Sequence, residues 1–80
     1  MSALFESVVN VISRRFRIDR AKVLPDVSFQ EIGLDSLSQI ELATTLQRDL
    51  GVSISDDDIA NMSTVADVVR WLEKQGLAAR

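Results

Sequence analysis

The first apolar residues of the chain recur at intervals of three and four, which is the repeat of one face of an α-helix. The pattern predicts a helix from Ser2 to about Phe16, with Ser2 as its N-cap. Arg14 and Arg15 would lie in its last turn, where the helix dipole favours positive charge. The predicted inward face consists of Leu4, Phe5, Val8, Val9, Ile12 and Phe16.

The helical repeat fails between Arg17 and Asp35. Pro25 disfavours helix at the residue before it, and Gly33 interrupts the pattern further on. Apolar residues are scattered through this segment: Val23, Leu24, Val27, Phe29, Ile32 and Leu34. We therefore expect a long structured loop whose apolar side chains hold it over the core, and such loops are often functional.

A second helix is predicted from Ser36 to about Leu50, with Gly51 as its C-terminal stop. Ser36 and Gln39 fit a Ser-x-x-Gln capping box, and Asp35 adds negative charge at the positive end of the helix dipole. The residues that keep the helical interval are Leu37, Ile40, Ala43, Leu46 and Leu50.

Two further helices follow a short extended link at residues 52–54. Ser55 or Asp56 would cap a short helix that ends near Met62. Thr64 with Asp67 would cap the last helix, which ends before Gly76, and residues 77–80 are expected to fray. The inward residues of the last helix are Val65, Val68, Val69 and Leu72.

These elements predict an all-α fold: a small bundle of three main helices plus one short helix, with a long structured loop between the first two. We expect residues 1–80 to form a single domain, with no internal repeat and no linker. The chain has 80 residues, of which 46% are hydrophobic and 26% charged, as expected of a small globular domain rather than a disordered chain.

The residue types that are missing restrict the chemistry. The chain has no Cys, His or Tyr. It therefore has no disulfide, no Cys-based zinc site and no thiol nucleophile, and it lacks the commonest general base and metal ligand. We predict no catalytic residue and no metal site, and any thiol chemistry must be supplied by an added group.

The net charge of −3 is unevenly distributed. Between Asp26 and Asp58 the only base is Arg48, whereas basic residues gather between Arg14 and Lys22. The acidic middle would attract basic partners and repel nucleic acid, although an ordinary solubilising surface explains the pattern equally well. No apolar run suits a signal peptide or a transmembrane span, so we expect a cytoplasmic protein without membrane insertion.

The segment from Gly33 to Leu37 is the one place where chemistry could occur. It puts the Ser36 hydroxyl in the first turn of a helix, where unpaired N–H groups and the dipole would favour a phosphate ester. Leu34 and Leu37 would anchor both sides of this corner in the core. Asp35 could help a partner enzyme to hold Mg²⁺. The simpler alternative, a serine that only caps the helix, is the commoner situation.

The whole chain resembles an acyl carrier protein, of the superfamily that includes polyketide-synthase carriers and peptidyl carriers. The resemblance is carried by Gly-Leu-Asp-Ser-Leu at 33–37, Ile-Glu-Leu at 40–42, Gly-Val-Ser-Ile at 51–54, the acidic Asp-Asp-Asp-Ile at 56–59, Phe-Gln-Glu-Ile-Gly at 29–33 and Thr-Val-Ala-Asp-Val-Val at 64–69.

The resemblance implies that a phosphopantetheinyl transferase would attach 4′-phosphopantetheine from coenzyme A to Ser36. The thiol of that group would carry acyl intermediates as thioesters, and the absence of Cys fits a single imported thiol. The domain itself would be a non-catalytic monomer. Its further partners would be acyl-transferring, ketosynthase or adenylating enzymes.

The resemblance also implies a docking face on the second helix, with Asp35, Ser36, Leu37 and Glu41 as contacts. Leu37 could instead pack in the core, and Glu41 could be a solvated charge. The acidic run at 56–58 is better explained as charge at a helix start than as a recognition site. An acyl chain could lie between the second and last helices, although core packing is the favoured role of the candidate lining residues: Ile40, Leu46, Ile54, Ile59, Ala66 and Val69.

The second helix is less acidic than is usual in carriers of fatty-acid synthesis, since Arg48 opposes its few acids. Weaker steering favours a dedicated pathway, either polyketide or another specialised acyl pathway. Three alternatives stay open: an aminoacyl or peptidyl carrier of nonribosomal peptide-type synthesis, a general fatty-acid carrier, and a helical interaction module without a prosthetic group.

Overall fold

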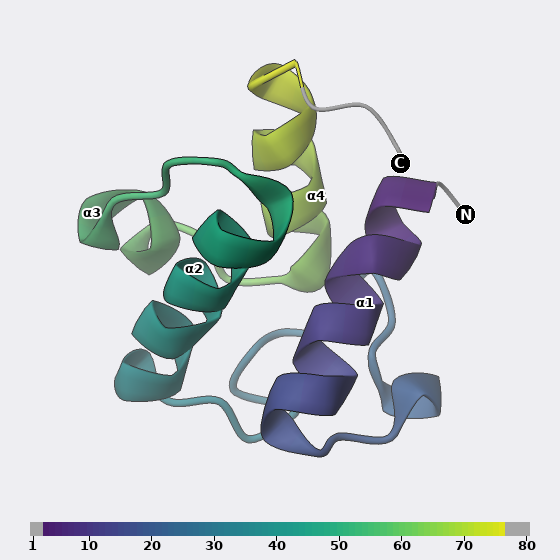
Figure 1. The fold of residues 1–80 in the computed structure, drawn as a ribbon. Coiled ribbons are helices and arrows are strands. Elements are labelled where there is room, and N and C mark those ends of the chain that lie inside the picture. The colour runs from purple at the N-terminus through teal and green to yellow at the C-terminus, as the bar shows by residue number, and fades with distance from the viewer. Residues whose placement is uncertain (1–2, 77–80) are drawn as a thin grey trace.

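The computed structural model describes residues 3–76 and is helical (Figure 1). Its elements are α1 (Ala3–Phe16), the 3-10 turn η1 (Arg20–Lys22), α2 (Ser36–Leu50), α3 (Asp56–Ala60) and α4 (Val65–Lys74). α1 packs against α2 and α4, and α2 packs against α3. The predicted all-α architecture is confirmed. The predictions for Ser2 and for residues 77–80 fall outside the described residues.

The long structured loop predicted between α1 and α2 also contains η1, a turn that was not predicted. The Asp19 carboxylate caps this turn by accepting the N–H of Ala21 at 3.0 Å. A turn of three residues is too short to produce a periodic pattern, so apolar spacing could not predict it.

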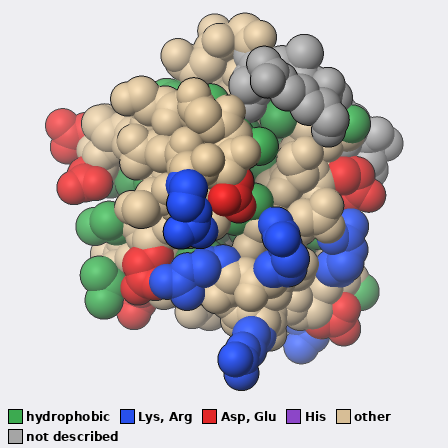
Figure 2. All heavy atoms as spheres, viewed as in Figure 1, with side chains coloured by type: hydrophobic (Ala, Val, Ile, Leu, Met, Phe, Trp, Pro, Cys, Tyr) green, Lys and Arg blue, Asp and Glu red, His purple; other side chains and the backbone are tan. Residues whose placement is uncertain are grey.

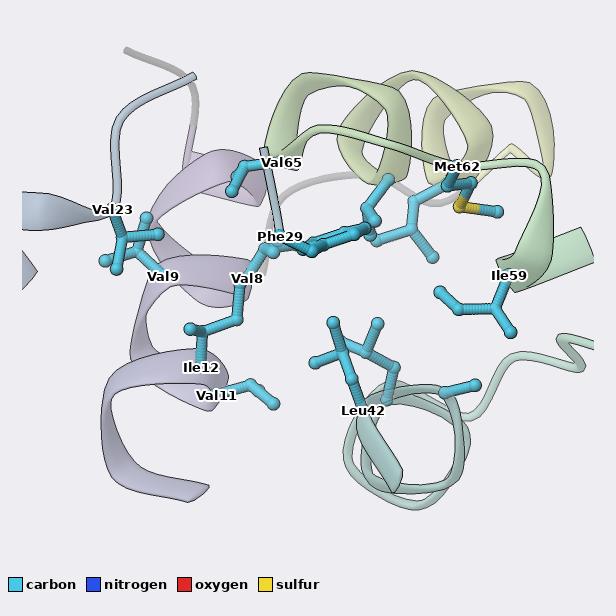
Figure 3. Close-up of a cluster of buried hydrophobic side chains, with 14 of the residues drawn as sticks. Val8, Val9, Val11, Ile12, Val23, Phe29, Leu42, Ile59, Met62 and Val65 are labelled. Carbon is cyan, nitrogen blue, oxygen red and sulfur yellow. The ribbon is translucent and has the colours of Figure 1, made fainter. Parts of the chain in front are cut away.

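The long loop is held over the core, as expected. Val23, Phe29 and Leu34 are buried, whereas Leu24 is 56% exposed. Figure 3 shows Phe29 among core side chains from α1, α2 and the α3–α4 region. Backbone hydrogen bonds fasten the loop to the start of α4: Phe29 N–H donates to Ser63 C=O at 3.0 Å, Val65 N–H to Val27 C=O at 3.2 Å and Ala66 N–H to Pro25 C=O at 2.9 Å.

Most of the predicted helix ends are confirmed. Gly51 adopts a left-handed conformation with φ 68° and closes α2 by donating its N–H to Gln47 C=O. Ser55 with Asp58 and Thr64 with Asp67 form capping boxes at the starts of α3 and α4. α3 is shorter than predicted and ends at Ala60. Each cap satisfies backbone N–H groups that a helix start leaves unpaired.

The predicted inward face of α2 is partly wrong. Leu37 is 65% exposed and Ile40 is 39% exposed, whereas the buried residues of α2 are Leu42, Ala43, Thr45 and Leu46. Ile40 lies two residues before Leu42, about 200° around the helix, so the two side chains cannot both face inward. The side of α2 that packs on α1 and α3 is the side of Leu42, and the apolar residues of the first turns are left outside.

The predicted inward faces of the other helices are closer to the structure. In α1 all of the predicted residues are buried except Phe16, which is partly buried, and Val11 is buried in addition. In α4 Val65, Val68 and Leu72 are buried, and Val69 is partly buried. Within the described residues, no helix is both long enough and apolar enough to cross a bilayer.

Candidate functional site

The chain enters α2 through a tight turn. The carbonyl of Phe29 accepts the N–H of Ile32 at 3.2 Å and of Leu34 at 2.8 Å. Gly33 has φ 84°, in the left-handed region where residues with a Cβ are strained. Leu34 then turns into the core with 5% of its surface exposed. The turn therefore fixes the position at which the chain leaves the core, one residue before α2.

Asp35 is the N-cap of α2. Its backbone is extended (φ −89°, ψ −174°), and its carboxylate accepts the N–H of Ser38 at 2.8 Å. This bond holds the pKa of Asp35 below its ordinary value, because it favours the ionised carboxylate. The predicted capping box of Ser36 and Gln39 is therefore wrong. Asp and Ser cap helices equally well, and the sequence alone does not choose between neighbours.

With Asp35 as the cap, Ser36 becomes the first residue of the helix, and it is exposed. Its side chain lies at the electropositive end of α2, where an attached phosphate would be stabilised by first-turn N–H groups and the dipole. An exposed hydroxyl that does not serve as the cap therefore fits a phosphodiester. The chain has no His or Cys that could activate this hydroxyl.

Large aliphatic side chains lie beside this hydroxyl at the surface. Leu37 follows Ser36 directly and is 65% exposed, and Ile40 lies three residues further along the helix. The expectation that Leu37 anchors the corner in the core is wrong, and Leu34 alone does so. Leu37 and Ile40 are three residues apart, so they lie on the same side of the helix and form a small exposed apolar surface beside Ser36.

Glu41 is held by an ion pair that sequence reasoning missed. Arg15 of α1 reaches its carboxylate at 2.5 Å, and the two side chains are 46% and 38% exposed. The Arg15 guanidinium also lies 5.5 Å from the centre of the Phe16 ring. The partners are 26 positions apart, so only the packing of α1 against α2 brings them together. Glu41 is thus an internally paired charge rather than a freely solvated one.

The six candidate lining residues are divided between core and surface. Leu46, Ile54 and Ile59 are buried, Ala66 and Val69 are partly buried, and Ile40 lies at the surface of α2. Binding of an acyl chain among them stays a prediction. The acidic run at 56–58 occupies the first turn of α3, where the Asp58 carboxylate accepts the N–H of Ser55.

The cap provides a test of the site geometry. We expect Asp35→Ala to lower the melting temperature by about 5 °C at pH 7, because a capping bond is lost. Asp35→Asn keeps an acceptor and should melt near the wild type. Because the pKa of Asp35 is lowered, its ionised carboxylate stabilises the fold fully at pH values above its ordinary pKa of 3.8. This contribution is lost as the pH falls through the lowered pKa.

Thermal melts followed by circular dichroism between pH 7 and pH 2 would measure both effects. Asparagine does not ionise, so the melting temperature of Asp35→Asn should fall less between pH 7 and pH 2 than that of the wild type. Identical melting of Asp35→Ala and the wild type at pH 7 would show that another group caps α2.

Comparison with known proteins gives consistent matches over almost the whole chain. Residues 6–72 match the family model described as a phosphopantetheine attachment site. The chain is 38% identical over 77 residues to an acyl carrier protein of Helicobacter pylori strain G27, a match that covers 95% of this chain and 99% of that protein. It is 36% identical, with the same coverage, to an acyl carrier protein of Helicobacter pylori strain ATCC 700392 / 26695.

Proposed function

Because this chain belongs to the acyl carrier protein family, whose members are non-catalytic carriers with a 4′-phosphopantetheine prosthetic group, we propose that Ser36 is the residue that bears the group. One observation carries the assignment. Asp35 caps α2, and the exposed Ser36 hydroxyl is left at the electropositive start of the helix. A hydroxyl in this position can be reached by a transferase, and the helix favours the charge of the resulting diester.

Each residue around Ser36 has a physical task in this proposal. Leu34 anchors the corner in the core, Gly33 allows the turn before it, and Asp35 fixes the start of the helix. When bound, the prosthetic group supplies the thiol that the chain lacks, and acyl groups are held on it as thioesters. Formation of the phosphodiester releases the nucleotide part of coenzyme A, and a partner enzyme accepts the serine proton.

The docking face supports a dedicated pathway, in polyketide or specialised fatty-acyl synthesis. Glu41 is already paired with Arg15, and Leu37 and Ile40 present apolar surface beside the attachment residue. Docking on such a face depends on shape and apolar contact more than on charge steering. An aminoacyl or peptidyl carrier, or a general fatty-acid carrier, would use the same serine, and the enzymes that load the thiol distinguish these alternatives.

Intact-mass measurement tests the assignment of the group and of the pathway. After incubation with coenzyme A, Mg²⁺ and a promiscuous phosphopantetheinyl transferase, we expect the protein to gain the mass of one phosphopantetheine. An unchanged mass would contradict the proposal. The mass of the group bound as a thioester to protein from the native host would then identify the pathway. We expect a polyketide intermediate. A bound amino acid would contradict the proposed pathway.

The exposed leucine of the docking face gives a second test. We expect Leu37→Ala to raise the KM of the transferase for this protein about tenfold, because an apolar side chain buried at the interface is lost. The value of kcat should change little. The matched control is Leu24→Ala, which removes another exposed leucine, 56% accessible, from the loop outside α2.

Glu41 should contribute less than Leu37 to binding of the transferase. Glu41→Gln removes a charge that Arg15 already neutralises, so we expect a change in KM of less than about threefold. Steady-state kinetics with all three variants would measure these effects. An equal rise for Leu37→Ala and Leu24→Ala, or a larger rise for Glu41→Gln, would contradict the apolar docking face.

A further inference from the structure

A groove separates α1 from the C-terminal half of α2. Its volume is about 280 Å³. The buried side chains of Val11 and Thr45 form its floor, and exposed charged side chains form its walls. The wall residues are Arg14, Arg15, Arg48 and Asp49. In Figure 2, Lys and Arg side chains gather on the face of the molecule that α1 and α2 form.

The positive charge of this groove is only partly neutralised within the chain. Arg15 is paired with Glu41. Arg14 donates from Nε to the carbonyl of Asn10 at 3.3 Å, a contact that leaves its charge uncompensated. The Arg48 side chain is 72% exposed, and its contact with Asp49 is long, at 3.4 Å. The groove therefore presents two guanidinium groups, those of Arg14 and Arg48, with donors available to an outside acceptor.

We propose that this groove docks an acidic segment of a partner protein, and that the carboxylates of the segment bind between Arg14 and Arg48. This interaction goes beyond the proposed attachment at Ser36. Arg48 lies twelve residues after Ser36, about 18 Å along the helix at about 1.5 Å per residue. A protein seated in the groove would hold the carrier while the Ser36 end of α2 stays open to a second enzyme.

The chemistry of the groove selects protein carboxylates among the possible anions. Guanidinium groups bind carboxylates through two parallel hydrogen bonds. A nucleic acid would present a continuous row of phosphates, which would meet Asp49 in the groove wall and the acidic residues that surround α2 and α3. A single small ion would gain little from side chains as exposed as these. A short segment with a few carboxylates can place them on the arginines and avoid Asp49.

The test is a titration of the ¹⁵N-labelled full chain with an end-blocked hexaglutamate peptide, followed by NMR at low salt. We expect chemical-shift changes at Val11, Arg14, Thr45 and Arg48, and their disappearance at high salt. The double variant Arg14→Gln/Arg48→Gln should raise the Kd for hexaglutamate about tenfold. The matched control Lys22→Gln/Lys74→Gln removes the same charge at exposed residues outside the groove and should change the Kd by less than about twofold.

Several results would overturn the proposal. An equal loss in both double variants would show that only net charge matters. The same shifts at equal or lower concentrations of a short oligothymidylate would assign the groove to nucleic acid, and the same shifts with inorganic phosphate alone would assign it to a small ion. Shifts at the groove when the unliganded protein is concentrated would show that a second copy of this chain occupies it. The spectra of the variants report directly whether they are folded.

Discussion

Replacing Ser36 by alanine should abolish the mass gain that coenzyme A and a phosphopantetheinyl transferase give the wild-type protein. The expected effect is complete, because the phosphodiester cannot form without the hydroxyl oxygen. Ser36 is the first residue of α2, and alanine is the residue most compatible with a helix there. Intact-mass spectrometry of both proteins after the same incubation measures the effect.

Ser38→Ala is the matched control for this experiment. Ser38 lies in the same first turn, and it contributes its backbone N–H to the cap, which alanine retains. The control variant should be loaded at the wild-type rate. Loading of Ser36→Ala would overturn the site assignment, whereas failure of both variants and of the wild type would overturn the carrier proposal itself.

The same serine variant distinguishes two accounts of the helix start. If Asp35 caps α2, Ser36→Ala should leave the melting temperature within about 2 °C of the wild type, because no capping bond is lost. If Ser36 were the cap, as the sequence pattern indicated, alanine would lower it by about 5 °C. A combined measurement of mass and melting therefore tests the chemistry and the geometry of Ser36 separately.

The sequence predicted the helices well because their signals are local. Apolar spacing, the Thr64–Asp67 pair and Gly51 each depend on residues within a few positions of one another. The inward face of α2 could not be predicted equally well. Apolar residues occur on two sides of this helix, and which side is buried depends on where α1 and α3 lie. For Leu37 the sequence therefore left core packing and a docking contact both open, and the structure places it at the surface.

The features of the candidate site that depend on contacts between helices could not be predicted from the sequence either. The resemblance to a family pointed to Ser36, but the sequence did not show that Asp35 takes over the capping role and leaves that hydroxyl outside the cap. The ion pair of Arg15 with Glu41 joins residues on two helices, so no short-range sequence pattern predicts it. The groove between α1 and α2 likewise exists only because the fold brings Arg14 and Arg48 to the same face.

Phe29→Ala should cause the largest loss of stability among single substitutions in the loop. The Phe29 ring is completely buried, at 0% exposure, and truncation of a buried phenylalanine costs about 3–5 kcal/mol. A chain of 80 residues has a stability near the low end of about 5–15 kcal/mol, so most of it would be lost. We expect the melting temperature to fall by more than about 10 °C. Urea and thermal unfolding followed by circular dichroism measure both quantities.

The effect of this substitution should reach the attachment residue, because Phe29 connects the core to the start of α2. Its carbonyl closes the turn to Leu34, and its N–H fastens the loop to Ser63. Phe29→Leu keeps most of the apolar volume and should lose less than half as much stability, and Leu24→Ala, at an exposed position, should lose less than about 0.5 kcal/mol. If Phe29→Ala were no less stable than Leu24→Ala, the loop would not be held by the core, and the position of Ser36 would need another explanation.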